Sequence, residues 1–184
     1  WVVNRGSHSH SPDEVELLRK KGQQIWFYGG AGAILAPSRV ENLKWPWMAW
    51  GRETDGFCWW NGMSSGNWEK VGLGGDHCLY DGTRFGGPGP LASIRLKVLH
   101  RGMQDHAYLT LLDRKTGSRA ASDAIVRATI GCKDREDWYQ RHEKSEVSGA
   151  DIQTSSKTEK AWNTALWPAW NAARAGLAKA LAAK

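Results

Sequence analysis

Short hydrophobic runs alternate with amphipathic segments over the first sixty residues. The runs WVV, QIWFY and GFCWW lack polar alternation, which predicts strands that are buried on both faces. Between the first two runs, SPDEVELLRKKG carries the signals of a helix: Ser11 as cap, Pro12 at the first helical position and Gly22 at the stop. A second helix is predicted from near Val40 into WPWMAW. The order strand, helix, strand, helix, strand is typical of a parallel sheet in an α/β fold.

The pattern changes after residue 60. Residues 61–90 form a glycine-rich loop, within which DHCLY predicts one short strand. From Leu91 to Lys115 the apolar residues recur at helical spacing, with Gly102 as a predicted weak point. Further helices are predicted at 122–130 and 135–142, followed by a polar connector. The last predicted helix is alanine-rich, and Pro168 must kink or restart it.

Composition places the chain among folded globular proteins. It has 184 residues, 41% of them hydrophobic, and a formal net charge of +6. No apolar run is long enough to cross a membrane, and Lys and Arg are scattered rather than gathered into a basic arm. We therefore expect neither a membrane nor a nucleic acid as partner. The opening WVV resembles a strand that is cut at its first residue, which predicts that the chain begins inside a larger protein.

Several candidate sites are better explained by structure than by chemistry. Asp13 and Glu14 fall in a first helical turn, where acids complement the helix dipole. The HSH segment has no third ligand nearby, and GGAG lacks the spacing of a phosphate-binding loop. The three cysteines form no zinc pattern, so we interpret them as buried free thiols. No metal or cofactor is predicted.

The aromatic residues are the more informative set. Five of the chain's twelve tryptophans lie within residues 45–60. Ligands of parallel α/β folds bind at the carboxyl ends of strands, where Tyr28, Trp60 and Asn61 are predicted to stand. An aromatic ring beside an amide can hold a sugar, although core packing of Trp60 is an equally good interpretation. The other tryptophans of the first sixty residues are expected to be structural, with Trp47 and Trp50 packed against the sheet and Trp26 and Trp59 in the core.

Several motifs in a fixed order carry a family resemblance. PWMAW, DGFCWWN, a glycine-rich loop, GDHCLYDG and SIRLKVLHRGMQDHAYLTLL together resemble the C-terminal part of the glycoside hydrolase family 123 catalytic domain, also known as domain of unknown function 4091. The match covers about residues 24 to 112. The chain departs from the family pattern where acids are replaced, at Lys97, Arg101, Gln104 and Ala107.

The resemblance implies a fold, an activity and a set of site residues. The fold is an α/β (β/α)8 TIM-type barrel, of which residues 1–143 would supply about three βα units. Residues 144–184 would add a connector and a helix that packs on the barrel. The activity is substrate-assisted hydrolysis of β-linked N-acetylhexosaminides, such as N-acetylgalactosaminides, by an Asp-Glu pair expected upstream of Trp1.

Within such a site, this chain would contribute only substrate-binding residues. Tyr28 and Trp60 would form an aromatic wall, and Asn61 would supply an amide to the sugar. The alternative is a non-catalytic carbohydrate-binding protein that uses the same wall. A secreted or periplasmic location is consistent with the family, and the oligomeric state stays open. A three-stranded barrel fragment would leave strand edges unpaired, so the isolated chain is expected to aggregate.

Overall fold

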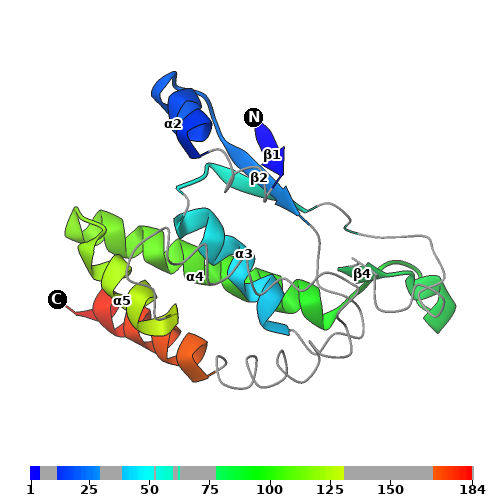
Figure 1. Ribbon diagram of the computed structural model, residues 1–184. Helices are drawn as coiled ribbons and strands as arrows, with labels where there is room; N and C mark the ends of the chain where they lie inside the picture. The colour runs from blue at the N-terminus through cyan, green and yellow to red at the C-terminus, as the bar shows by residue number, and fades with distance from the viewer. Residues whose placement is uncertain are drawn as a thin grey trace, which may run out of the picture. The chain divides into compact units, whose positions relative to one another are not determined.

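The computed structural model describes residues 1–4, 12–29, 39–51, 53–59, 62, 78–130 and 168–183 of the chain. These residues form two compact units, Trp1–Gly102 and Met103–Lys184. The first holds a small parallel sheet with its helices, and the second is helical (Figure 1). The prediction of a mixed α/β fold is thereby confirmed. The predicted boundary between residues 143 and 144 and the predicted helix at 135–142 lie outside the described residues.

Three parallel strands form the sheet in the order of the sequence. These are β1 (Val2–Asn4), β2 (Trp26–Gly29) and β3 (Gly56–Trp59). In the register, Val2 pairs with Trp26, and Trp26 in turn pairs with Gly56. Two helices make the crossovers, α2 (Pro12–Lys20) and α3 (Arg39–Gly51). The first five predicted elements are therefore present in the predicted order.

Helix α2 begins and ends where its sequence signals lie. Pro12 is its first residue, and Asp13 and Glu14 occupy the first turn. Gly22 adopts the left-handed conformation with φ of 71°, as expected for a glycine that stops a helix. The predicted cap, Ser11, lies outside the described residues.

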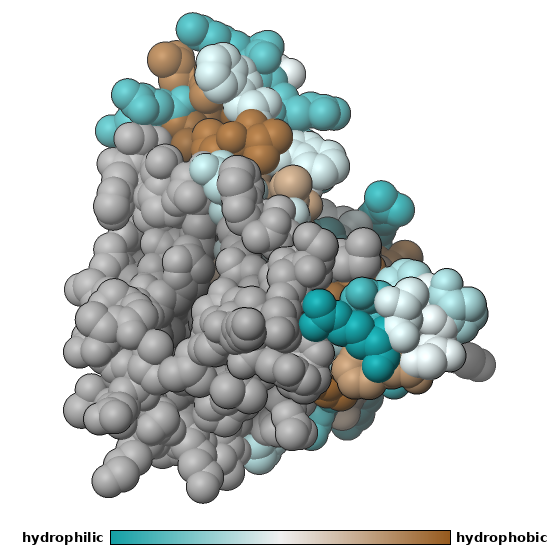
Figure 2. Space-filling model, turned by 90° about the vertical axis from the view of Figure 1, so that its right-hand side faces the viewer, coloured by the Kyte–Doolittle hydropathy of each residue, from teal (hydrophilic) through white to brown (hydrophobic). Residues whose placement is uncertain are grey.

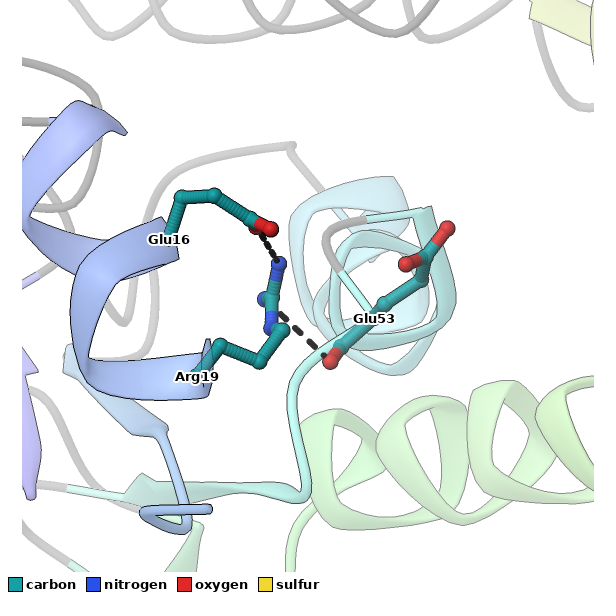
Figure 3. A network of polar contacts seen from close by, with 3 residues as sticks. All are labelled: Glu16, Arg19 and Glu53. Carbon is teal, nitrogen blue, oxygen red and sulfur yellow. Dashed lines mark hydrogen bonds and ion pairs between the residues drawn. The ribbon is translucent and has the colours of Figure 1, made fainter. Parts of the chain in front are cut away.

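Arg19 fastens α2 to the turn that follows α3. Its guanidinium donates from Nη1 to the Glu16 carboxylate at 3.2 Å and from Nη2 to the Glu53 backbone carbonyl at 3.3 Å (Figure 3). The contact with Glu16 lies one turn along the same helix, whereas the contact with Glu53 spans 34 residues of sequence. The second contact therefore positions one crossover helix relative to the other.

The described side chains of α3 are buried from Asn42 to Trp50. Its buried residues are Asn42, Leu43, Trp45, Pro46, Trp47, Met48, Ala49 and Trp50. The second half of α3, from Trp45 to Trp50, is apolar and belongs in a core, and this explains why the segment gathers tryptophan. Trp45 makes the sheet contact, since its ring stacks on Phe27 at 5.4 Å and meets Trp59 edge-on at 5.8 Å.

The opposite side of α3 receives α4 (Ile94–Thr116). A β-carbon on Gly102 would stand 2.5 Å from the Leu43 carbonyl oxygen and 3.1 Å from Pro46. Glycine is therefore required for the close helix crossing, and α4 runs without a break through Gly102, the predicted weak point. At 100° per residue, Trp50 lies on the same side of α3 as Leu43 and Pro46. The prediction that Trp50 packs on the sheet is thus not supported; Trp45 has that role.

Two short strands form a second sheet before α4. β4 (Leu79–Tyr80) lies within the predicted DHCLY strand and pairs antiparallel with β5 (Leu91–Ala92), with the 3₁₀ helix η2 (Gly82–Phe85) between them. The helix predicted from Leu91 therefore begins three residues later, at Ile94. Ser93 caps it, because its hydroxyl accepts from the Leu96 N–H at 3.3 Å.

The second unit is built from the end of α4, from α5 (Ala120–Ile130) and from a helix at residues 168–182. The buried Asp105 carboxylate accepts from Arg174 at 3.1 Å, joining α4 to the last helix. The guanidinium of Arg174 also donates to Gln104 and lies over the Tyr108 ring. Lys115 donates to the Leu181 carbonyl at 2.8 Å, at the end of that helix, where a cation complements the dipole. The residues before Pro168 lie outside the described part of the chain, so the predicted kink or restart at Pro168 stays a prediction.

Candidate functional site

The two faces of the parallel sheet differ in burial. Residues that are paired in parallel register project to the same face, so Val2, Trp26, Tyr28 and Cys58 share one face while Phe27 and Phe57 share the other. Phe27 is fully buried against α3, whereas Trp26 is 39% exposed and Val2 56% exposed. The predicted burial of these strands on both faces is therefore wrong. We call the exposed set the open face.

Hydrophobic side chains reach the surface in this part of the molecule. Figure 2 shows them over the region of α2 and β1. Trp1 is 65% exposed and precedes β1, the strand that pairs with β2 alone among the described strands. The prediction of a buried strand at WVV is wrong, since Trp1 and Val2 are exposed to solvent. An apolar face next to an unpaired strand edge is characteristic of a surface that another protein segment covers.

The indole of Trp26 lies across the open face onto Gly56. A β-carbon at Gly56 would stand 2.8 Å from the ring, too close for any side chain. The indole therefore covers the start of β3 while its outer surface stays accessible. Trp26 is a surface residue of the open face, and the prediction that it packs in the core is wrong.

Tyr28 is the predicted site residue that the structure describes. It is half-buried near the carboxyl end of β2, on the open face, with Cys58 as its partner in register on β3. Trp60 and Asn61, the other two predicted site residues, lie outside the described residues. The structure thus places Tyr28 at the expected end of the sheet but does not bring the three together.

Cys58 was missed by the reasoning from sequence. It is exposed, whereas Cys78 is buried as predicted and Cys132 lies outside the described residues. The interpretation of all three as buried thiols is therefore wrong for Cys58. Its position two residues into β3 gave no signal, because the burial of a strand residue depends on which face other elements cover.

A second group of polar atoms lies on the helix-covered face, at the same end of the sheet. The side chain of Asn42, in the first part of α3, is completely buried, and neither its nitrogen nor its oxygen has a hydrogen-bond partner. The Nε1 of Trp59, the last residue of β3, is also buried without a partner. Buried polar groups are nearly always paired, so this group requires an explanation.

Acidic residues that could serve in catalysis are absent from the described strands. The strands β1, β2 and β3 contain no Asp or Glu. Asp55, just before β3, accepts from the Ile25 N–H at 2.7 Å and joins the amino ends of two strands, which is a structural role. Asp13 and Glu14 are exposed in the first turn of α2, as predicted.

Two ionisable groups with shifted pKa values belong to elements other than the parallel sheet. The hydroxyl and backbone N–H of Thr83 donate to Asp81 at the start of η2, and these hydrogen bonds lower the pKa of that carboxyl. Burial lowers the pKa of His106 in α4, with a further contribution from the nearby positive charge of Arg119, while Asp113 opposes both. Neither group lies on the open face, so both shifts are treated as structural.

The described residues include no cluster of three His, Cys, Asp or Glu side chains placed to hold a metal ion. Within the same residues, no helix is sufficiently long and apolar to cross a membrane. The HSH segment and the GGAG segment lie outside the described residues.

Comparison with known proteins does not identify a relative. No protein-family model matches this chain, and no curated protein is similar enough in sequence to be counted as related.

Proposed function

We propose that this chain is the C-terminal portion of a (β/α)8 barrel related to glycoside hydrolase family 123, acting on β-linked N-acetylhexosaminides. The observation that carries the proposal is the open face. Three parallel strands in sequential order, with α3 on one face and exposed apolar side chains on the other, match a sector cut from a barrel. In a complete barrel the open face would line the packed interior.

Tyr28 would form part of the sugar-binding wall at the carboxyl end of this sector. Active sites of such barrels are built at that end, from residues near strand ends and from the loops that follow. The flat ring would pack against the C–H face of a sugar. Trp60 would add a second ring and Asn61 an amide, as the family resemblance implies.

The catalytic carboxylates would belong to a part of the barrel that this chain does not contain. The described strands carry no acid, and the proposed chemistry needs an Asp-Glu pair. One carboxylate would orient the substrate's acetamido group, whose oxygen attacks the anomeric carbon. The other would protonate the leaving oxygen. This chain would then hold the sugar without cleaving it.

A binding experiment tests the assignment of Tyr28. N-acetylgalactosamine titrated into the chain and followed by NMR should bind weakly, and Tyr28→Ala should weaken binding about tenfold through loss of the stacking surface. Phe85→Ala is the matched control, because Phe85 is 56% exposed on η2 rather than on the open face. Equal binding by the wild type and Tyr28→Ala would remove Tyr28 from the proposed site.

A non-catalytic carbohydrate-binding protein is the second candidate, favoured by the same absence of acids from the described strands. An aryl N-acetyl-β-galactosaminide separates the candidates once the chain is extended at its amino end. An extended protein that turns the substrate over supports the hydrolase, whereas one that only binds it supports the binding protein. Turnover by this chain alone would contradict the proposal that its catalytic pair lies elsewhere. Binding should also survive high salt, unlike the binding of a nucleic acid.

A further inference from the structure

The buried amide of Asn42 is the strongest unexplained feature of the first unit. Its side chain is 0% exposed, and both of its polar atoms lack a partner. The backbone beside it is also affected, because Pro46 has no N–H to donate to the Asn42 carbonyl four residues earlier. The side chain of Asn42 is therefore unpaired, and its carbonyl lacks the usual donor of an α-helix four residues later.

Trp45 links the unpaired Trp59 indole to the turn of α3 that carries Asn42. Trp45 follows Asn42 by one helical turn, and its ring meets that of Trp59 at 5.8 Å. Helical side chains tilt toward the amino end of their helix, so the Asn42 amide is directed toward the start of α3. That end of α3 follows β2 and lies with the last residue of β3 at the carboxyl edge of the sheet.

The chemistry of these atoms selects the group that they would bind. Trp59 Nε1 can only donate, whereas the Asn42 amide can donate and accept. The first N–H groups of α3, a helix of 13 residues, add donors and a positive partial charge. A carboxylate would leave the Asn42 oxygen unpaired. A hydroxyl can accept from the donors and donate to that oxygen.

We propose that Asn42 and Trp59 form a subsite for a hydroxyl group of a sugar, at the amino end of α3. This inference rests on the proposed function and adds two residues on the helix-covered side of the sheet. Tyr28 would contact the sugar from the open face at the same edge. The subsite explains why a buried helix keeps an amide where an apolar side chain would fit.

Two substitutions test the subsite. Trp59→Phe keeps an aromatic ring for the contact with Trp45 and removes the N–H with the five-membered part of the indole, while Asn42→Leu removes the amide. Each should weaken binding of N-acetylgalactosamine by about fivefold to tenfold, as measured by NMR titration. Both variants should keep the circular dichroism spectrum of the wild type, and Phe85→Ala should bind as the wild type does. If Asn42→Leu fails to fold, Trp59→Phe carries the test.

Deoxy analogues of N-acetylgalactosamine, each lacking one hydroxyl, identify the hydroxyl that the subsite binds. For the analogue that lacks the bound hydroxyl, Trp59→Phe should cause no further loss, because its partner is already gone. If Trp59→Phe and Asn42→Leu bind N-acetylgalactosamine as tightly as the wild type, the subsite is refuted and a buried water is the better explanation of the unpaired atoms.

Failure of the subsite and failure of the proposed function have different signatures. Loss of binding in Tyr28→Ala, with none in Trp59→Phe or Asn42→Leu, would overturn the subsite alone. Methyl β-galactopyranoside has the hydroxyls but no acetamido group. If it binds with dependence on Asn42 while N-acetylgalactosamine does not bind, the subsite stands and the proposed function fails. Absence of binding by both sugars overturns both proposals.

Discussion

Glu53 shows how a single residue can conflict with the backbone that it occupies. Its φ of 52° is left-handed, and no other non-glycine residue in the described ranges has a positive φ. The Thr54 N–H donates to the Ala49 carbonyl and the Glu53 N–H to the Trp50 carbonyl, which is the hydrogen-bond pattern of a Schellman motif at the end of α3. Glycine is the usual residue at this position, since a β-carbon is strained there.

Glu53→Gly should therefore stabilise the protein. We expect the free energy of unfolding to rise by about 1 kcal/mol, because the strain is relieved while the carbonyl that accepts from Arg19 is kept. Urea denaturation measures the change. Glu53→Ala is the control, since it removes the carboxylate but keeps the β-carbon. An equal gain in the alanine variant would show that φ is not the cause.

His106 predicts a dependence of stability on pH. Burial lowers the pKa of His106 in the folded state, so the unfolded chain binds a proton first as the pH falls through about 6.5. The free energy of unfolding should accordingly decrease as the pH is lowered from 7.5 to values below the pKa of His106 in the folded protein. His106→Gln should lose less stability over the same range in matched urea titrations. Identical pH profiles for the two proteins would exclude this contribution.

At the scale of elements, the ion pair between α4 and the last helix is the clearest joint of the second unit. Asp105 is completely buried, whereas the Arg174 side chain is 28% exposed. A buried carboxylate is costly unless a cation remains beside it. The two helices are therefore held by a contact that neither partner can lose without penalty.

Arg174→Met should lower the free energy of unfolding by about 3 kcal/mol, since it keeps an apolar stem but leaves the Asp105 charge without this partner. Adding Asp105→Asn should recover part of the loss, and the two changes should couple by about 1 kcal/mol or more. Gln104→Ala controls for the weaker contact that Arg174 makes at the surface. Strictly additive effects in the double-mutant cycle would show that the Asp105–Arg174 ion pair does not stabilise the contact between the two helices.

Most elements could be predicted from sequence because each carries its own local signal. Pro12 and Gly22 mark the ends of α2, and the apolar runs mark β2 and β3. β5 could not be predicted, because two residues give no periodicity and its pairing with β4 is not local. For the site, the strand end at Tyr28 was predictable, but the unpaired atoms of Asn42 were not. They depend on what surrounds a helix rather than on the residues within it.

The first unit, taken as a whole, presents an apolar surface that its own described residues do not cover. Trp1, Val2 and Trp26 are exposed next to β1, whose outer edge pairs with none of the described strands. Such a surface favours association between chains.

The isolated chain should therefore self-associate in a concentration-dependent way, as measured by light scattering after size exclusion. Val2→Lys should reduce association, since a charge on an edge strand opposes pairing. Leu111→Lys adds the same charge to α4, where Leu111 is 48% exposed in the second unit, and should have little effect. A monodisperse monomer with a sharp melt would contradict the prediction.

The boundary between the two compact units falls between Gly102 and Met103, within α4 rather than in a linker. The backbone hydrogen bonds of a helix join each residue to the one four positions earlier, so they run across this boundary. A protease that cuts exposed loops would find no site there, and a recombination event at these codons would sever the helix. The two units are therefore expected to be inherited together and not exchanged as separate modules.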